Sequence, residues 1–190
     1  MNNLSNEQKI INLLFKDFLT LYNSRIIGKV IGISHPGAFK ILKKLEKRGI
    51  VRPKTIGKAV IYSLNLDNPI AVKEIEMALI IEASNYKRWI GEFKELNEKA
   101  DFVVLFGSIL RNEKEARDID LLIVCNKSDF NYIKEIIDKR NRILNKKIHL
   151  LVQTKEDFKK DMLNKNKAII EIIKTGIILF GQDNLTKIMK

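Results

Sequence analysis

Residues 31–51, IGISHPGAFKILKKLEKRGIV, decide the fold of the first third of the chain. Ser34 is a favourable N-cap residue and Pro36 suits a first helical turn, so we expect a helix to begin here. Gly49 is expected to end that helix in the left-handed conformation. Three apolar residues at helical spacing are predicted to face inward: Phe39, Leu42 and Leu45.

The flanking sequence extends this helix in both directions. Before it, apolar spacing predicts one helix over residues 6–21 and a second, short helix over residues 26–31 that ends at Gly32. After it, residues 50–53 and 60–64 form two β-type runs joined by a basic segment. A helix pair with a tight turn and a following hairpin is the arrangement of a winged helix-turn-helix. The stretch 24–64 resembles the winged-helix domains of bacterial and archaeal transcriptional regulators, which implies binding to double-stranded DNA.

Charge distribution supports a polyanionic partner for this region. Of the net charge of +12, residues 1–65 carry +9, with twelve Lys/Arg against three Asp/Glu, whereas residues 66–100 carry −2 and residues 101–190 carry +5. The candidate DNA-contacting residues are Ser34, His35, Lys40, Lys43, Lys44, Lys47, Arg48, Arg52, Lys54 and Lys58. The alternative is a winged helix used for protein contacts, with these lysines as a solvated face and His35 as an exposed first-turn residue.

A long helical pattern follows the hairpin and divides the chain into domain 1–68, connecting helix 69–100 and domain 101–190. Its apolar stripe consists of Ile75, Leu79, Tyr86, Trp89, Phe93 and Leu96. Regulators that read two half-sites need a two-fold partner, so the stripe is a candidate homodimer seam. It is equally compatible with packing inside one chain.

The last part of the chain carries paired carboxylates. A buried strand over residues 102–106 ends at Gly107-Ser108, and a second strand over residues 117–124 places Asp118 and Asp120 on one face, roughly 7 Å apart. Like charges this close require a cation. Mg²⁺ is the natural one, because it takes carboxylate oxygens together with substrate phosphate oxygens, while a Gly-Ser turn offers N–H groups and a hydroxyl to the phosphates.

Gly-Ser, nine residues and then Asp-Ile-Asp resembles the signature of the DNA polymerase β-type nucleotidyltransferase superfamily in its minimal form. The resemblance implies a nucleoside triphosphate ligand at Gly107, Ser108 and Arg111, a metal at Asp118 and Asp120, and a third carboxylate on the strand 147–152. His149 stands at that third position. Imidazole is a poor ligand for Mg²⁺ but a competent general base, so the resemblance leaves catalysis by Asp118, Asp120 and His149 open. A helix over 155–175, a stop at Gly176 and a strand to Phe180 complete the resemblance.

The sequence therefore predicts an α+β protein: an N-terminal winged helix-turn-helix, a long connecting helix and a nucleotidyltransferase-like mixed sheet with helices. Two functions agree with it. One is a DNA-binding transcriptional regulator whose second domain is catalytically degenerate; the other is a Mg²⁺-dependent nucleotidyltransferase acting on a protein or small-molecule hydroxyl, including as the antitoxin to a small helical toxin. The single cysteine, Cys125, is expected to be buried. No apolar run reaches ~18 residues and no secretory signal precedes Lys9, so a cytoplasmic protein without membrane contact is expected.

Overall fold

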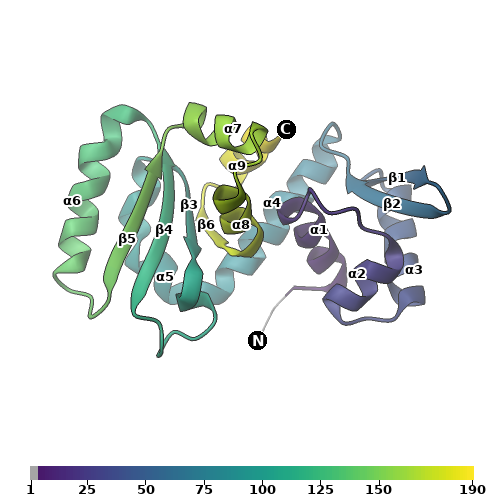
Figure 1. Cartoon of the computed structure of the whole chain (residues 1–190), viewed down its shortest axis with the longest axis horizontal. Helices are drawn as coiled ribbons and strands as arrows, with labels where there is room; N and C mark the ends of the chain where they lie inside the picture. The colour runs from purple at the N-terminus through teal and green to yellow at the C-terminus, as the bar shows by residue number, and fades with distance from the viewer. Residues whose placement is uncertain (1–3) are drawn as a thin grey trace. The chain divides into compact units, whose positions relative to one another are not determined.

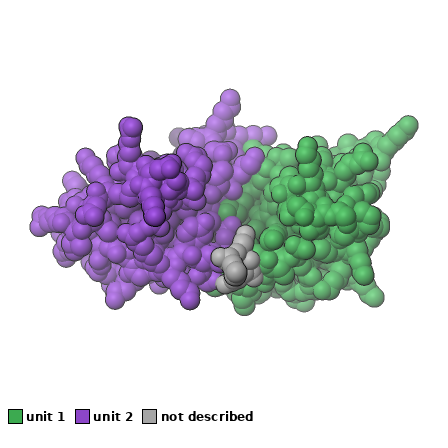
Figure 2. All heavy atoms as spheres, turned by 90° about the horizontal axis from the view of Figure 1, so that it is seen from below, with its two compact units in different colours: residues 1–81, 190 green, residues 82–189 purple. Residues whose placement is uncertain are grey.

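The computed structural model describes residues 4–190; residues 1–3, the start of the predicted domain 1–68, lie outside the described residues. The chain divides into two compact units, residues up to 81 and residues 82–189, coloured green and purple in Figure 2. Within the described residues, none of the helices has the length and apolar character that a membrane span requires.

The first unit consists of α1 (Asn6–Lys16), α2 (Ser24–Ile31), α3 (His35–Lys47), β1 (Val51–Ile56), β2 (Ala59–Leu64) and all but the last two residues of α4 (Pro69–Ala83) (Figure 1). Local sequence explains the central elements. Gly32 ends α2 in the left-handed conformation with a φ of 76°, the Ser34 hydroxyl accepts a hydrogen bond from the Gly37 amide at 3.2 Å, and Gly49, with a φ of 70°, follows α3. β1 and β2 pair antiparallel across a turn at Gly57. The predicted helix pair and hairpin are therefore present.

Helix α1 is shorter than predicted, because it ends at Lys16 instead of continuing to Leu21. The carboxylate of Asp17, which is buried, accepts hydrogen bonds from the Tyr22 hydroxyl at 2.7 Å and the Thr20 hydroxyl at 2.8 Å. These bonds hold the chain in a turn directly after the helix. The apolar residue Leu21 consequently lies 61% exposed, outside any helix.

The inward orientation predicted for Phe39 is wrong, because its ring is 45% exposed. The buried face of α3 is formed by Ala38, Leu42 and Leu45, which follow one another at intervals of four and three residues. Phe39 is the neighbour of Ala38 in sequence and so lies about 100° away around the helix axis. It therefore faces outward beside Lys43, whose ammonium lies 5.8 Å from the ring centre.

The single connecting helix predicted for residues 69–100 is also wrong, because α4 ends at Ala83 and residues 84–98 form three short segments. Ser84 and Asn85 are poor helix formers, and the Asn85 side chain donates a hydrogen bond to the Glu82 carbonyl at 3.1 Å. The predicted stripe is divided. Five of its residues are buried, two of them in the first unit and three in the second: Ile75, Leu79, Trp89, Phe93 and Leu96. The stripe is thus no exposed seam.

The second unit begins with η1 (Ser84–Tyr86), α5 (Lys87–Glu92), η2 (Lys94–Glu98), β3 (Ala100–Phe106), η3 (Gly107–Leu110), β4 (Asp118–Cys125) and η4 (Lys127–Asp129). It continues with α6 (Phe130–Asn141), β5 (Lys147–Gln153), α7 (Lys155–Leu163), α8 (Lys167–Thr175), β6 (Ile177–Phe180) and α9 (Gln182–Met189). The strand order is β5-β4-β3-β6, with β5 parallel to β4 and the other pairs antiparallel (Figure 1). This mixed sheet confirms the predicted α+β class.

Helices cover both faces of this sheet. On one face, residues of β3 and β4 form a buried cluster with α5, η2 and α6, and this cluster includes Leu121 and Cys125. On the other face, Phe158 of α7 packs edge-on against Phe102 at 5.0 Å. The helix predicted over 155–175 is divided into α7 and α8, since Lys165 has a φ of 54° and the Asn166 side chain caps α8. The two aspartates lie at the start of β4 and are partly exposed.

Candidate functional sites

The outward face of α3 is basic. Three exposed lysines repeat along it at intervals of three or four residues: Lys40, Lys43 and Lys47. Lys43 lies 2.8 Å from Glu46, and this hydrogen bond raises the pKa of Lys43. In the part of the chain that the structure describes, Lys40 and Lys47 contact no carboxylate. His35 occupies the first turn of α3, where its Nε2 lies 2.9 Å from the Ser24 hydroxyl, and Ser34 is occupied as the N-cap.

Besides Lys43, three more of the predicted DNA-contacting cations pair with carboxylates of the first unit. Lys44 and Arg48 both contact Glu7, and Arg48 also contacts Glu74 of α4. Arg52 of β1 lies 2.9 Å from Asp67. These pairs lower the net positive charge at their positions, so the outward face of α3 carries more of the available charge than the side near α1.

The hairpin places its two predicted cations at different points. Lys54 lies within β1, opposite Ile61, and Lys58 follows Gly57 in the turn. Both side chains are exposed. The segment predicted as a loop over 54–58 is therefore mostly strand, with the turn confined to its last two residues.

Paired carboxylates lie at the start of β4. Because side chains alternate along a strand, Asp118 and Asp120 share a face with the buried residues Leu122 and Val124. The two side chains are 30% and 23% exposed. Burial, followed by the charge of Asp118, raises the pKa of Asp120, while His149 opposes this effect. Asp118 and Asp120 are therefore two neighbouring carboxyl groups that are partly shielded from solvent.

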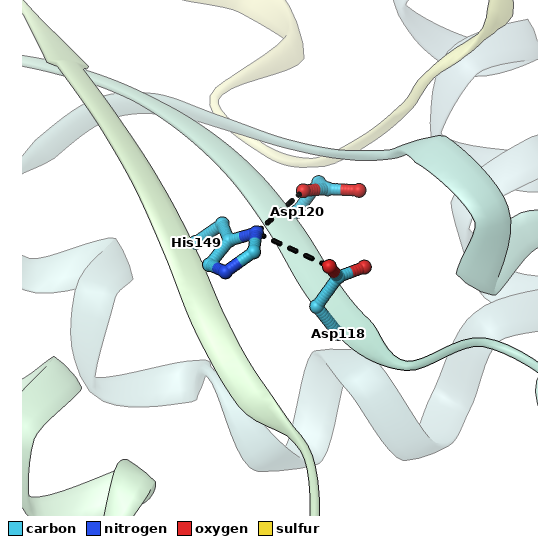
Figure 3. Close-up of side chains that lie close together, drawn as sticks. All are labelled: Asp118, Asp120 and His149. Atoms are coloured by element: carbon cyan, nitrogen blue, oxygen red, sulfur yellow. Dashed lines mark ion pairs between the residues drawn. The ribbon is translucent and has the colours of Figure 1, made fainter.

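The third predicted residue, His149, joins these carboxylates. In the parallel pairing of β4 with β5, His149 lies opposite Asp120, so its side chain projects from the same face of the sheet. Its Nδ1 lies 3.2 Å from Asp118 Oδ2 and 3.6 Å from Asp120 Oδ1 (Figure 3). The ligand-type atoms of the three residues all lie within 4.8 Å of one another. The sequence prediction that grouped these residues therefore corresponds to one spatial cluster.

Gly107 brings the predicted phosphate turn against the cluster. Its φ is 81°, and a Cβ added there would lie 2.0 Å from Asp120 Oδ2. The positive φ favours glycine, and a side chain here would also displace the Asp120 carboxylate. Ser108 follows in the half-buried turn, and its carbonyl accepts the amide of Arg111 at 3.0 Å. Arg111 itself is exposed.

The donor set fits Mg²⁺ only in part. Carboxylate oxygens suit this hard cation, but an imidazole nitrogen at the third position does not. The geometry is therefore that of a glycine turn beside a mixed oxygen and nitrogen cluster.

This combination of a mixed sheet, a glycine turn and two aspartates on the neighbouring strand matches one known family. Residues 87–179 match the nucleotidyltransferase domain family. The matched segment runs from α5 into β6 and so includes β3, β4, β5 and the cluster. No curated protein matches the chain.

Among solved structures, the chain is similar to Lactococcus lactis ZitR. For the wild-type protein in complex with DNA, the identity is 21% over 48% of this chain and 63% of that chain, with a TM-score of 0.34. For a double mutant in its apo form, the identity is 16% over 74% of this chain and 83% of that chain, again with a TM-score of 0.34. The chain thus spans 63% of the length of the DNA-bound relative. The winged-helix arrangement of the first unit is assigned from its own helices and hairpin.

Sequence reasoning missed two features of these sites. One is the exposure of Phe39 on the basic face of α3. The sequence could have indicated it, because Ala38, Leu42 and Leu45 also follow helical spacing and leave Phe39 outside the buried face. The other is the part that Gly107 plays in the nucleotidyltransferase-like segment, where it makes room for the Asp120 carboxylate as well as forming the turn. That second feature follows from the register that sets Phe106 opposite Asp120.

Proposed function

We propose that the protein is a DNA-binding transcriptional regulator that contacts duplex DNA through α3 and the β1–β2 hairpin. The carrying observation is the cationic face of α3, where Lys40 and Lys47 are exposed and contact no carboxylate within the described residues. A helix of this kind fits the major groove when a second helix precedes it through a tight turn and a hairpin follows. The Lactococcus lactis relative was solved in complex with DNA.

Phe39 adds support of a different kind. A phenyl ring that is 45% exposed among lysines gains nothing from water, whereas an apolar contact with a thymine methyl group is one of the direct readouts of the major groove. The lysines around it would contact phosphates and set the position of the helix. Together these residues provide both binding strength and a means of reading sequence.

The second unit is proposed to act as a nucleotide-binding sensor domain, with Gly107, Ser108 and Arg111 at the phosphates. A homodimer would match two-fold related half-sites, but the apolar stripe that suggested it is buried within the chain. The homodimer therefore stays a prediction, which light scattering can test. Cytoplasmic location and a small helical toxin as partner likewise stay predictions.

The test is fluorescence anisotropy of the full chain with labelled duplex DNA at several salt concentrations. For the double variant Lys40→Gln with Lys47→Gln, we expect weaker binding and a log K against log salt slope reduced by about 1.8, from two lost phosphate contacts. The matched control is Lys134→Gln with Lys139→Gln, which removes the same charge from α6. Binding that ignores salt, or an equal loss in the control, contradicts the proposal.

A second candidate function is nucleotidyl transfer to a protein or small-molecule hydroxyl. The observation that favours it is the position of Asp120 beside the Gly107 turn, with Asp118 in the same cluster, inside the matched nucleotidyltransferase segment. A labelled nucleoside triphosphate distinguishes the two. Label transfer that Asp120→Asn abolishes supports the enzyme, whereas nucleotide binding without transfer supports the sensor. Transfer that appears only in His149→Asp supports a degenerate site.

A further inference from the structure

We propose that Asp118, Asp120 and His149 bind a divalent transition cation, of the class of Mn²⁺, Co²⁺ or Zn²⁺, in preference to Mg²⁺. The proposal starts from the mismatch between the imidazole and the hard cation that two carboxylates alone would favour. It goes beyond the proposed function and does not depend on it, because it concerns cation binding by these three side chains and requires neither DNA nor a nucleotide.

The donor atoms are spaced like neighbouring ligands of one metal. Bonds of roughly 2.0–2.2 Å in tetrahedral or octahedral geometry place adjacent ligand atoms about 2.8–3.6 Å apart. The His149 Nδ1 lies 3.2 Å from one carboxylate oxygen and 3.6 Å from the other. Small rotations of exposed or half-exposed side chains would therefore close the three donors around a cation.

The backbone holds these donors in place. Asp118 and Asp120 are fixed on β4, and the parallel register sets His149 opposite Asp120 (Figure 3). The two oxygens of Asp120 face different ways, since Oδ2 lies against Gly107 and Oδ1 lies nearer His149. Oδ1 of Asp120 is therefore available as a metal ligand, while the Gly107 turn restrains Oδ2.

Chemistry decides which cation the cluster takes. Two carboxylates beside a neutral imidazole carry a net charge of −2 and so favour a divalent cation. Imidazole suits zinc and the later transition metals, and Mn²⁺ accepts carboxylates, whereas Mg²⁺ gives up its water shell reluctantly and prefers oxygen ligands. The competing arrangement is a closed hydrogen bond between protonated His149 and Asp118 that holds no metal.

The experiment uses Co²⁺ as the probe, because its visible absorption reports the ligands around it. Titration of the full chain with Co²⁺ is expected to give an absorption band that saturates at one Co²⁺ per chain. Zn²⁺ should displace the Co²⁺ and abolish the band, whereas a hundredfold excess of Mg²⁺ should leave it unchanged. His149→Ala should weaken Co²⁺ binding by about tenfold or more. His35→Ala is the matched control, since the chain contains two histidines, and should leave the band unchanged.

The second part of the experiment asks whether a variant reverses the preference for Co²⁺ over Mg²⁺. The variant His149→Asp, at an exposed position, should lose Co²⁺ affinity relative to Mg²⁺ because all three donors become oxygens. Circular dichroism verifies that each variant folds. Displacement of Co²⁺ by equimolar Mg²⁺ in the unaltered chain, equal losses in both alanine variants, or the absence of any band overturns the proposal and leaves the closed hydrogen bond. DNA binding, measured by anisotropy, is a separate outcome.

Discussion

Cys125, at the end of β4, illustrates how position governs a single residue. Its side chain is fully buried in the cluster formed with α5 and α6. Burial, with smaller contributions from the charges of Asp129 and Asp101, raises the pKa of the thiol to about 11. Since thiolate is the reactive form, both protonation and access limit the chemistry of this residue.

We therefore expect Cys125 to resist thiol reagents in the folded protein. With a pKa of about 11, only about one molecule in a thousand carries the thiolate at pH 8, and that fraction rises tenfold with each pH unit up to the pKa. Reaction with a chromogenic disulfide should be slow at pH 8 and become rapid in 6 M urea. Fast labelling of the native chain at pH 8 would contradict the burial.

Among the helices and strands, those with local sequence signals are the ones predicted correctly. α2 and α3 have side-chain caps and glycine stops, and β3, β4 and β5 are apolar runs bounded by polar residues. The Asp-Ile-Asp alternation likewise placed both carboxylates on one face. These signals involve neighbours in sequence, so one chain without any alignment suffices to find them.

The features that sequence reasoning missed depend on partners far along the chain. Helix α1 ends where Asp17 meets Tyr22, and the charges of Lys44 and Arg48 are countered by Glu7, 37 and 41 residues away. Nor does periodicity distinguish one helix over residues 69–100 from α4 followed by three short segments, because the apolar residues of α4 and those of the later segments are buried in two different cores. Such outcomes are decided by tertiary packing, which overrides local propensity.

Gly107 gives a prediction at the scale of a turn. Gly107→Ala and Gly57→Ala both force alanine to a positive φ, so each should cost about 1–2 kcal/mol of stability in urea denaturation. Only Gly107→Ala also places a methyl group on Asp120, whereas nothing lies within 4 Å of the Gly57 position. We expect the carboxylate to rotate away.

Imidazole resonances in NMR spectra check this displacement. Because His149 contacts Asp120 and His35 does not, only the His149 ring should shift in Gly107→Ala, and neither ring should shift in Gly57→Ala. An unmoved His149 signal would show that the turn does not restrain the carboxylate.

At the scale of the whole molecule, the two units differ in charge and complete their cores separately. The first unit needs α4, because Ile75 and Leu79 are fully buried, the Asn12 side chain donates to the Ala78 carbonyl at 3.4 Å and Arg48 contacts Glu74. The boundary predicted at residue 68 would remove this helix. A division near residue 81 keeps it.

We predict that fragment 1–81 unfolds cooperatively on heating and that fragment 1–68 does not. Burial of Ile75 and Leu79 contributes about 3–6 kcal/mol, which approaches the total stability of a small domain. Circular dichroism melts of both fragments measure the difference. Equal midpoints would mean that α4 is dispensable to the fold.

One consequence concerns β5, which lies at the edge of the sheet and contributes the histidine. Edge strands open locally before the interior of a sheet does, so amide hydrogens of residues 148–153 should exchange with solvent faster than those of residues 119–125. A ligand that joins His149 to the aspartates of β4 must dissociate before β5 can open. At a hundredfold excess over its Kd, such a ligand should slow exchange along β5 by about a hundredfold. Mass spectrometry of the exchanged protein therefore detects occupancy of the cluster as rigidity of a strand, and unchanged exchange in the presence of Zn²⁺ would show that nothing links the two strands there.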